Sequence, residues 1–195
     1  MPNVAIIPAR GGSSRIPHKN RKLFHGKPII AYSIMAAFDS GLFEEVIVST
    51  DCEHIAFIAE AYGAKVQMRD EAHSKDEVGT QEVARYVLDQ HEKKYELACV
   101  IYPTAPMLTA QDLILAMTAM SKARNFVMSV SSAPLSDAGQ FYLGRSEAFG
   151  TSVLIHPNTA MYPIPANRVK DINTPEDWAQ AEDMYAALVR NGTFG

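Results

Sequence analysis

Short apolar runs with strand character alternate with amphipathic helical stretches from the first residues of the chain. Several runs, such as residues 98–102, are apolar enough to be buried on both faces, as parallel strands are. Between them, apolar residues recur at helical spacing, for example in residues 28–40. The alternation predicts an α/β protein, a three-layer α/β/α sandwich around a mostly parallel, Rossmann-like sheet. Strands are expected at residues 4–8, 46–49, 65–68, 98–102, 126–130 and 140–143, and helices at residues 28–40, 53–62, 81–94 and 110–123.

The last helix has the clearest start signal. Thr174 suits the N-cap position, Pro175 the first helical position, and Glu176 and Asp177 the first turn. This pattern predicts a helix that ends near Arg190. Because the sequence shows no internal repeat, low-complexity tract or linker, we expect one domain over residues 1–195.

Charge and hydropathy argue against nucleic acid and membrane partners. Eighteen basic and 22 acidic side chains give a net charge of -4, which leaves no basic excess to bind a nucleic acid backbone. The longest apolar runs are shorter than the ~18 residues that suggest a spanning helix, and residues 1–9 lead into a polar turn rather than a signal cleavage site. The two cysteines, Cys52 and Cys99, lack C-x-x-C spacing and are expected to be free thiols. We therefore expect a cytoplasmic protein.

The loop after the first strand, residues 8–20, has the composition of a phosphate-binding site. Gly11 and Gly12 allow backbone N–H groups to converge on an anion, and Arg10, Arg15 and Lys19 add positive charge without any acidic residue. The loop matches neither G-x-x-x-x-G-K-[ST] nor G-x-G-x-x-G, which argues against an ATPase or a dinucleotide-binding protein. Its place after the first strand is the usual ligand position of an open α/β sheet. The alternative is a solvated basic loop.

This loop resembles the I-P-A-R-G-G-S-K-R-I-P-x-K-N signature of the CMP-sialic acid synthetase family, the acylneuraminate cytidylyltransferases, and most of all their pseudaminic acid type. Further matches are Gly26-Lys27-Pro28, residues 48–51 (Val-Ser-Thr-Asp), residues 137–142 and residues 171–178. The resemblance implies a nucleotide-diphospho-sugar transferase type of fold. It also implies an enzyme in which the anomeric hydroxyl of a nine-carbon acidic sugar attacks the α-phosphate of CTP, giving a CMP-sugar and pyrophosphate with the help of Mg²⁺.

The resemblance implies roles for individual residues. The triphosphate would be bound by the loop, and Arg10 and Lys19 would act in catalysis by neutralising charge on the departing pyrophosphate. Arg69 and Thr80 would read the acceptor atoms of cytosine, where the alternatives are a surface charge and a helix cap. The nucleotide-binding set is Ala9, Arg10, Gly11, Gly12, Ser13, Arg15, Lys19, Asn20, Arg69 and Thr80.

The acceptor sugar and the metal have their own implied residues. Tyr102 and Thr104 would bind the sugar, with Asp137, Gln140 and Phe141 closing the opposite wall. Asp171, counted as catalytic, and Asn173 would hold Mg²⁺ through carboxylate and carbonyl oxygens; alternatively, Asp171 caps a loop.

Three departures from the family pattern leave alternatives open. Ser14 stands where lysine is usual, and Asn173 stands where a second aspartate is usual. Residues 129–137 read as a short polar hinge, so the family's dimerisation arm is missing near residues 132–137, which leaves a homodimer as an open expectation. The leading hypothesis is a cytidylyltransferase acting on a nonulosonic acid of the pseudaminic or N-acetylneuraminic type. The alternatives are a CMP-sugar synthetase for a different keto acid and a CTP-binding protein with lost or altered catalysis.

Overall fold

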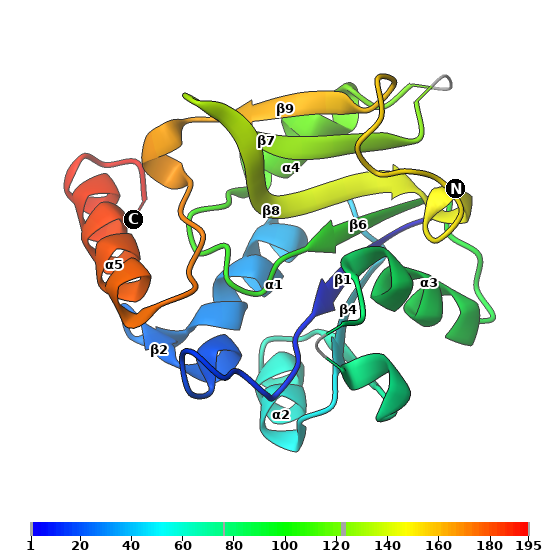
Figure 1. Ribbon diagram of the computed structural model, residues 1–195, viewed down its shortest axis with the longest axis horizontal. Helices are drawn as coiled ribbons and strands as arrows, with labels where there is room; N and C mark the ends of the chain where they lie inside the picture. Colours follow the sequence, from blue (N-terminus) through cyan, green and yellow to red (C-terminus); the bar gives the residue numbers. More distant parts are fainter. Residues whose placement is uncertain (1, 76, 122–123, 195) are drawn as a thin grey trace.

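A mixed β-sheet forms the middle layer of the molecule (Figure 1). The computed structural model describes residues 2–75, 77–121 and 124–194, and within these ranges the sheet has seven strands. They are β1 (Asn3–Pro8), β4 (Glu45–Thr50), β5 (Lys65–Met68), β6 (Leu97–Ile101), β7 (Phe126–Ser132), β8 (Leu135–Arg145) and β9 (Ala160–Ile164). Their order is β5-β4-β1-β6-β8-β7-β9, and among these strands only β8 runs antiparallel to its neighbours. The predicted mostly parallel sheet is confirmed.

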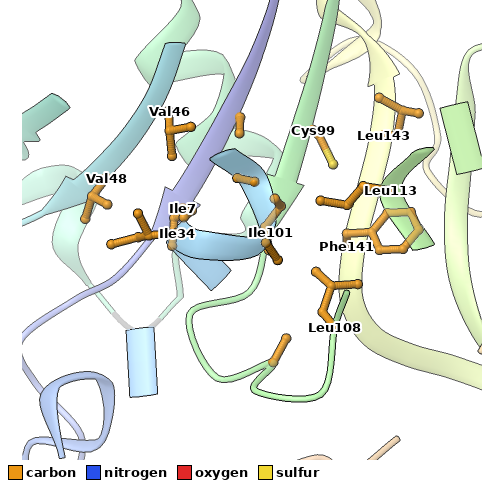
Figure 2. Close-up of a cluster of buried hydrophobic side chains, with 14 of the residues drawn as sticks. Ile7, Ile34, Val46, Val48, Cys99, Ile101, Leu108, Leu113, Phe141 and Leu143 are labelled. Atoms are coloured by element: carbon orange, nitrogen blue, oxygen red, sulfur yellow. The ribbon is translucent and has the colours of Figure 1, made fainter. Parts of the chain in front are cut away.

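Helices cover both faces of this sheet. One face carries α1 (Ile29–Asp39), α2 (Glu53–Ala61) and α4 (Ala110–Thr118), and the other carries α3 (Thr80–Gln90). Successive residues of β1 contact opposite layers, as the pleat of a strand requires. Ile7 packs with Ile34 of α1 (Figure 2), whereas Ile6 packs with Val87 of α3. The three-layer arrangement is therefore confirmed as well. Within the described ranges, no helix has the length and apolar character needed to span a membrane.

The last helix, α5 (Pro175–Arg190), packs against residues 16–32, which follow β1, instead of on the sheet (Figure 1). Thr174 and Asp177 form the predicted capping box at its start. Trp178 meets Phe24 edge to face, with ring centroids 5.6 Å apart, and Phe24 belongs to the small hairpin of β2 (Leu23–Phe24) and β3 (Lys27–Pro28). This contact brings residues 171–174 close to the loop that follows β1.

The region expected as a polar hinge is a β-hairpin. Strands β7 and β8 are joined by Ala133 and Pro134, and β8 is much longer than the four residues predicted. The Ser129 hydroxyl donates to the Phe141 carbonyl (3.1 Å) and accepts from the Phe141 and Gln140 N–H groups (3.0 and 3.2 Å) at an irregularity in the pairing. Polar residues therefore lie in a buried strand because the neighbouring backbone satisfies them.

Two predicted helices are too long. Helix α3 ends at Gln90 instead of residue 94, because its apolar stripe ends at Leu88 and residues 91–94 are polar. Helix α4 ends at Thr118, and residues 122–123 of the predicted helix lie outside the described ranges.

Candidate active site

A cavity of about 300 Å³ opens at the carboxyl edge of the parallel strands, the usual ligand position of such sheets. Its walls come from the loop after β1, the residue after β5, the start of α3 and the segment after β6. Five cationic side chains line it, and no described lining residue is acidic. The cations are Arg10, Arg15, Lys19, Arg69 and Lys75. The cavity is therefore suited to a polyanion.

The loop after β1 is folded back on itself by Asn20. The Asn20 amide donates to the Arg10 carbonyl oxygen (2.9 Å), and Asn20 is buried in the middle of the short helix η1 (Lys19–Arg21). This contact holds Gly12 and Ser13 at the cavity wall. Asn20 thus both lines the cavity and shapes the predicted phosphate loop.

Ala9 and Gly11 are not among the residues that line the cavity. Ala9 is fully buried, and its N–H donates to the Ser49 carbonyl oxygen (2.8 Å), so this N–H is not available to a phosphate. The Gly11 N–H donates to Asp51 Oδ1 (2.6 Å). Both backbone donors therefore bond to strand β4 and its loop in this structure, and the binding of the nucleotide by Ala9 and Gly11 stays a prediction.

Lys19 connects the phosphate loop to the segment before α5. Its ammonium donates to the Ile172 carbonyl oxygen (2.7 Å) and also lines the cavity. Burial lowers the pKa of Lys19, and the nearby Asp171 carboxylate partly opposes this effect. The predicted catalytic residues Lys19 and Asp171 therefore lie together.

Asp171 and Asn173 present the oxygen atoms that a hard divalent cation prefers. The Asn173 amide donates to Asp171 Oδ2, and the Asn173 N–H donates to Asp177 Oδ2 (3.0 Å). Helix α5 is capped by Thr174 and Asp177, so capping of that helix does not require Asp171. The pair fits a magnesium site that takes one or two protein ligands and leaves the rest to phosphate and water. Within the described ranges, no three His, Cys, Asp or Glu side chains gather as a metal site.

Arg69, the residue after β5, contributes a further cation to the cavity. Its N–H donates to the Thr50 carbonyl oxygen (2.7 Å) and its guanidinium donates to the His73 carbonyl oxygen (3.3 Å). Its Nε is buried and has no hydrogen-bond partner among the described residues. Burial lowers the pKa of Arg69, and the Asp51 carboxylate opposes this effect. Arg69 therefore adds a half-buried cation to the cavity wall.

Thr80 is the first residue of α3, and the N-cap is Gly79. The Thr80 hydroxyl lies 3.0 Å from the Tyr102 hydroxyl, and both residues line the cavity. The alternative of a helix cap is therefore wrong for Thr80. A hydroxyl pair at this wall can both donate to and accept from a base.

The residues expected to bind the acceptor sugar divide into two groups. Tyr102 and Thr104 line the cavity. Asp137 is an exposed residue of β8 that accepts a hydrogen bond from the Gly139 N–H (2.8 Å), and it is not among the lining residues. Gln140 is buried, and its amide donates to the Arg168 carbonyl oxygen (2.7 Å). Phe141 is fully buried among Leu108 and Leu113 (Figure 2), so the prediction that it forms a sugar-contacting wall is not supported.

Three further residues belong to this region although they were not predicted as site residues. Lys75 and Ser14 line the cavity. The Tyr142 hydroxyl donates to Asp137, and burial, followed by this hydrogen bond, raises the pKa of Tyr142. A single lysine in a polar stretch or a tyrosine in a strand is ordinary, so only the fold identifies them. The motif of residues 137–142 was the one signal that included Tyr142.

A cationic cavity beside a glycine loop, at the carboxyl edge of a parallel sheet, defines a nucleotide-binding α/β enzyme. The chain belongs to the cytidylyltransferase family, whose family model matches residues 4–145. This makes it a nucleotidyltransferase and confirms the resemblance drawn from the loop. Residues 146–194, which include Asp171 and α5, lie beyond the matched region.

Comparison with individual proteins narrows the class. The chain is 33% identical to pseudaminic acid cytidylyltransferase of Campylobacter jejuni, in an alignment of 224 residues that covers 95% of this chain and 97% of that protein. It is 31% identical to CMP-N,N'-diacetyllegionaminic acid synthase of Legionella pneumophila, with 93% and 95% covered. The structure of CMP:2-keto-3-deoxy-manno-octonic acid synthetase complexed with CTP is similar in fold, with a TM-score of 0.78 and 18% identity, covering 96% of this chain and 99% of that one.

Proposed function

We propose that the protein transfers CMP from CTP to a nonulosonic acid of the pseudaminic or N-acetylneuraminic type and releases pyrophosphate. The observation that carries the proposal is the cavity lined by five cations and no described acidic residue. Two relatives are named for pseudaminic acid and N,N'-diacetyllegionaminic acid, and these names support a nonulosonic acid as the acceptor.

The phosphate end of CTP would lie against the loop after β1. The backbone N–H groups of Gly12 and Ser13 and the side chains of Arg10, Arg15 and Lys19 would bind it. The anomeric hydroxyl forms a new O–P bond at the α-phosphate while the bond to the pyrophosphate oxygen breaks, and the hydroxyl loses its proton. Negative charge then grows on the pyrophosphate, where Arg10 and Lys19 stabilise it.

A divalent metal, proposed as Mg²⁺, would be held by the Asp171 carboxylate and the Asn173 carbonyl oxygen. When bound, it would neutralise phosphate charge and orient the α-phosphate. Lys19, anchored on the Ile172 carbonyl oxygen, holds this segment beside the phosphate loop.

The base and the acceptor would occupy the two remaining sides of the cavity. Arg69 would donate to cytosine O2 or N3, and Thr80 would complete this contact. Tyr102 and Thr104 would bind the sugar, and Asp137, whose carboxylate accepts from the Tyr142 hydroxyl, would accept its proton. Proximity of the two bound substrates would supply much of the acceleration.

The test is pyrophosphate release from CTP and Mg²⁺ with pseudaminic acid, N-acetylneuraminic acid and an eight-carbon keto acid as separate acceptors. We expect turnover with a nonulosonic acid, loss of activity with EDTA, and little turnover when UTP replaces CTP. Tight CTP binding without pyrophosphate release would support the alternative of lost catalysis. Turnover with the eight-carbon acid alone would support the alternative of a CMP-sugar synthetase for a different keto acid.

The remaining parts of the proposal concern setting and assembly. The free thiols Cys52 and Cys99 support a reducing compartment such as the cytoplasm. One domain without the family's arm, and a homodimer, stay predictions. The two-residue connection between β7 and β8 supports the absence of the arm. Sedimentation-velocity analysis of the purified protein tests the homodimer.

A further inference from the structure

Asp51 is an exposed residue in contact with the phosphate loop, although it is not among the residues that line the cavity. Strands β1 and β4 pair in parallel with Pro8 opposite Ser49, so the residues that follow them meet at the same edge of the sheet. Here Asp51 Oδ1 accepts a hydrogen bond from the Gly11 N–H at 2.6 Å. A carboxylate with a backbone N–H donor forms a charge-assisted hydrogen bond, which is stronger than a neutral one.

The contact is close as well as polar. A Cβ atom added at Gly11 would lie 2.7 Å from Cys52 Cβ, so Gly11 rests directly on the turn after β4. The Cys52 N–H donates to Thr50 Oγ1 (3.1 Å), and the Thr50 carbonyl oxygen accepts from the Arg69 N–H (2.7 Å). One turn, Thr50 to Cys52, therefore supports the phosphate loop on one side and the Arg69 backbone on the other.

The ordinary role of an aspartate at this position is to cap the following helix, and the structure does not show it. Helix α2 has Cys52 at its N-cap and no side-chain capping hydrogen bond within the described residues. The Asp51 carboxylate instead accepts a hydrogen bond from the Gly11 N–H, 40 residues earlier in the chain.

We propose that Asp51 is a positioning residue for nucleotide binding: by holding the Gly11 N–H, it sets the path of the loop so that Gly12 and Ser13 face the phosphates. This inference rests on the proposed function, because it assumes that the loop binds the phosphates of CTP. The hydrogen bond is the essential element, since a negative charge beside the loop would by itself weaken phosphate binding.

The experiment compares Asp51→Ala, which removes the acceptor, with Asp51→Asn, which keeps an acceptor oxygen and removes the charge. Glu53→Gln is the matched control, because Glu53 is an exposed acid on α2 that has no part in the cavity. Affinities for CTP, in the presence of Mg²⁺, and for cytidine are measured by calorimetry on each folded variant, with circular dichroism to establish folding.

We expect Asp51→Ala to weaken CTP binding about tenfold, the size of one charge-assisted hydrogen bond, with cytidine binding unchanged. Asp51→Asn and Glu53→Gln should bind CTP within about threefold of the unchanged protein, because both keep the loop in place. If Asp51→Ala does not fold, Asp51→Ser takes its place, because its shorter side chain does not reach the Gly11 N–H, and the same loss of CTP affinity is expected.

Three results would overturn the proposal: full CTP affinity in Asp51→Ala, an equal loss for CTP and cytidine, or a loss in Asp51→Asn as large as in Asp51→Ala. The affinities of the unchanged protein for CTP and cytidine show whether the role of Asp51 or the proposed function has failed. If it binds CTP no better than cytidine, the nucleotide site itself is wrong; if it prefers CTP and Asp51→Ala keeps that preference, only the role of Asp51 is wrong.

Discussion

Replacing Arg168 by methionine removes the cation from the best-buried ion pair of the molecule's described part. Two nitrogens of the Arg168 guanidinium donate to the two Asp112 carboxylate oxygens at 2.8 and 2.7 Å, and the side chains are 12% and 4% exposed. Asp112 keeps three other donors: the Thr109 hydroxyl (2.6 Å), the Thr109 N–H (3.0 Å) and the Tyr162 hydroxyl (3.1 Å). The pair joins α4 to the segment that leads to Asp171.

Removing one partner of a buried pair costs about 3–5 kcal/mol, because the other charge is left buried without compensation. The three remaining donors place Arg168→Met near the lower limit, at about 3 kcal/mol. For a chain of this size, that loss lowers Tm by about 6–12 °C. Unfolding in urea, followed by the fluorescence of Trp178 and by circular dichroism, measures the free energy of unfolding directly.

The pH dependence of the Arg168→Met effect has a definite sign. Burial raises the pKa of Asp112, but the Arg168 and Thr109 hydrogen bonds outweigh it, so its pKa is lowered in the folded protein. The stabilisation from such a group is present above its unfolded pKa and is lost as the pH falls through its folded pKa. Without Arg168, burial dominates and the pKa of Asp112 rises, so the stability difference between the two proteins should narrow as the pH falls from 7 toward about 4.

Arg85→Met is the matched control, because Arg85 pairs with Asp89 on the exposed surface of α3. Such a pair contributes less than about 1 kcal/mol. The reasoning would be refuted if Arg168→Met cost no more than Arg85→Met, or if acid widened the stability difference.

Four further predictions follow from single contacts. Arg10→Ala should lose about 2–4 kcal/mol of transition-state stabilisation, measured as kcat/KM for CTP, while Arg21→Ala, whose side chain is outside the cavity, should keep the rate; equal effects would reject the role of Arg10. Thr174→Ala should destabilise the fold by about 1 kcal/mol in urea through loss of the capping box, and no change would mean that the cap is dispensable. Gly144→Ala places a Cβ that would overlap the Phe126 ring and crowd the Asn125 carbonyl oxygen (3.0 Å), so Tm should fall by an amount equivalent to about 1–3 kcal/mol, and an unchanged Tm would contradict this packing. A thiol reagent should label Cys52 in the folded protein and leave Cys99 unlabelled until urea is added, because burial raises the pKa of the Cys99 thiol and covers it; rapid labelling of both would contradict this.

Local sequence signals predicted the elements whose partners are close in the chain. The capping box before α5 needs only Thr174 and Asp177, and the strands of the parallel sheet are apolar runs that stand out from their surroundings. Strand β9 was not predicted, because Pro163 argues against a strand. It is tolerated there because β9 pairs with β7 alone and lies at the edge of the sheet.

The candidate site was predictable where it is a continuous loop and less so where it depends on register. Arg10, Gly12, Ser13, Arg15 and Lys19 follow one strand and line one cavity. In β8, by contrast, neighbouring residues face opposite sides of the sheet. The sequence motif alone did not reveal that Phe141 enters the core while Tyr142 contacts Asp137.

Contacts between distant segments were beyond reach of the sequence. The bonds of Gly11 to Asp51 and of Arg168 to Asp112 join residues 40 and 56 positions apart. Their donors and acceptors are ordinary polar residues, and their pairing exists only because the sheet and α4 place them together.

The bond from Lys19 to the Ile172 carbonyl oxygen spans 153 positions. During synthesis on the ribosome, the sheet and its first helices emerge long before Ile172. Lys19 therefore has no carbonyl acceptor at this position until the end of synthesis. A nascent chain that stalls before Ile172 and α5 have emerged should therefore not bind CTP. Binding of the nucleotide should begin only once that helix has left the exit tunnel and packed against Phe24.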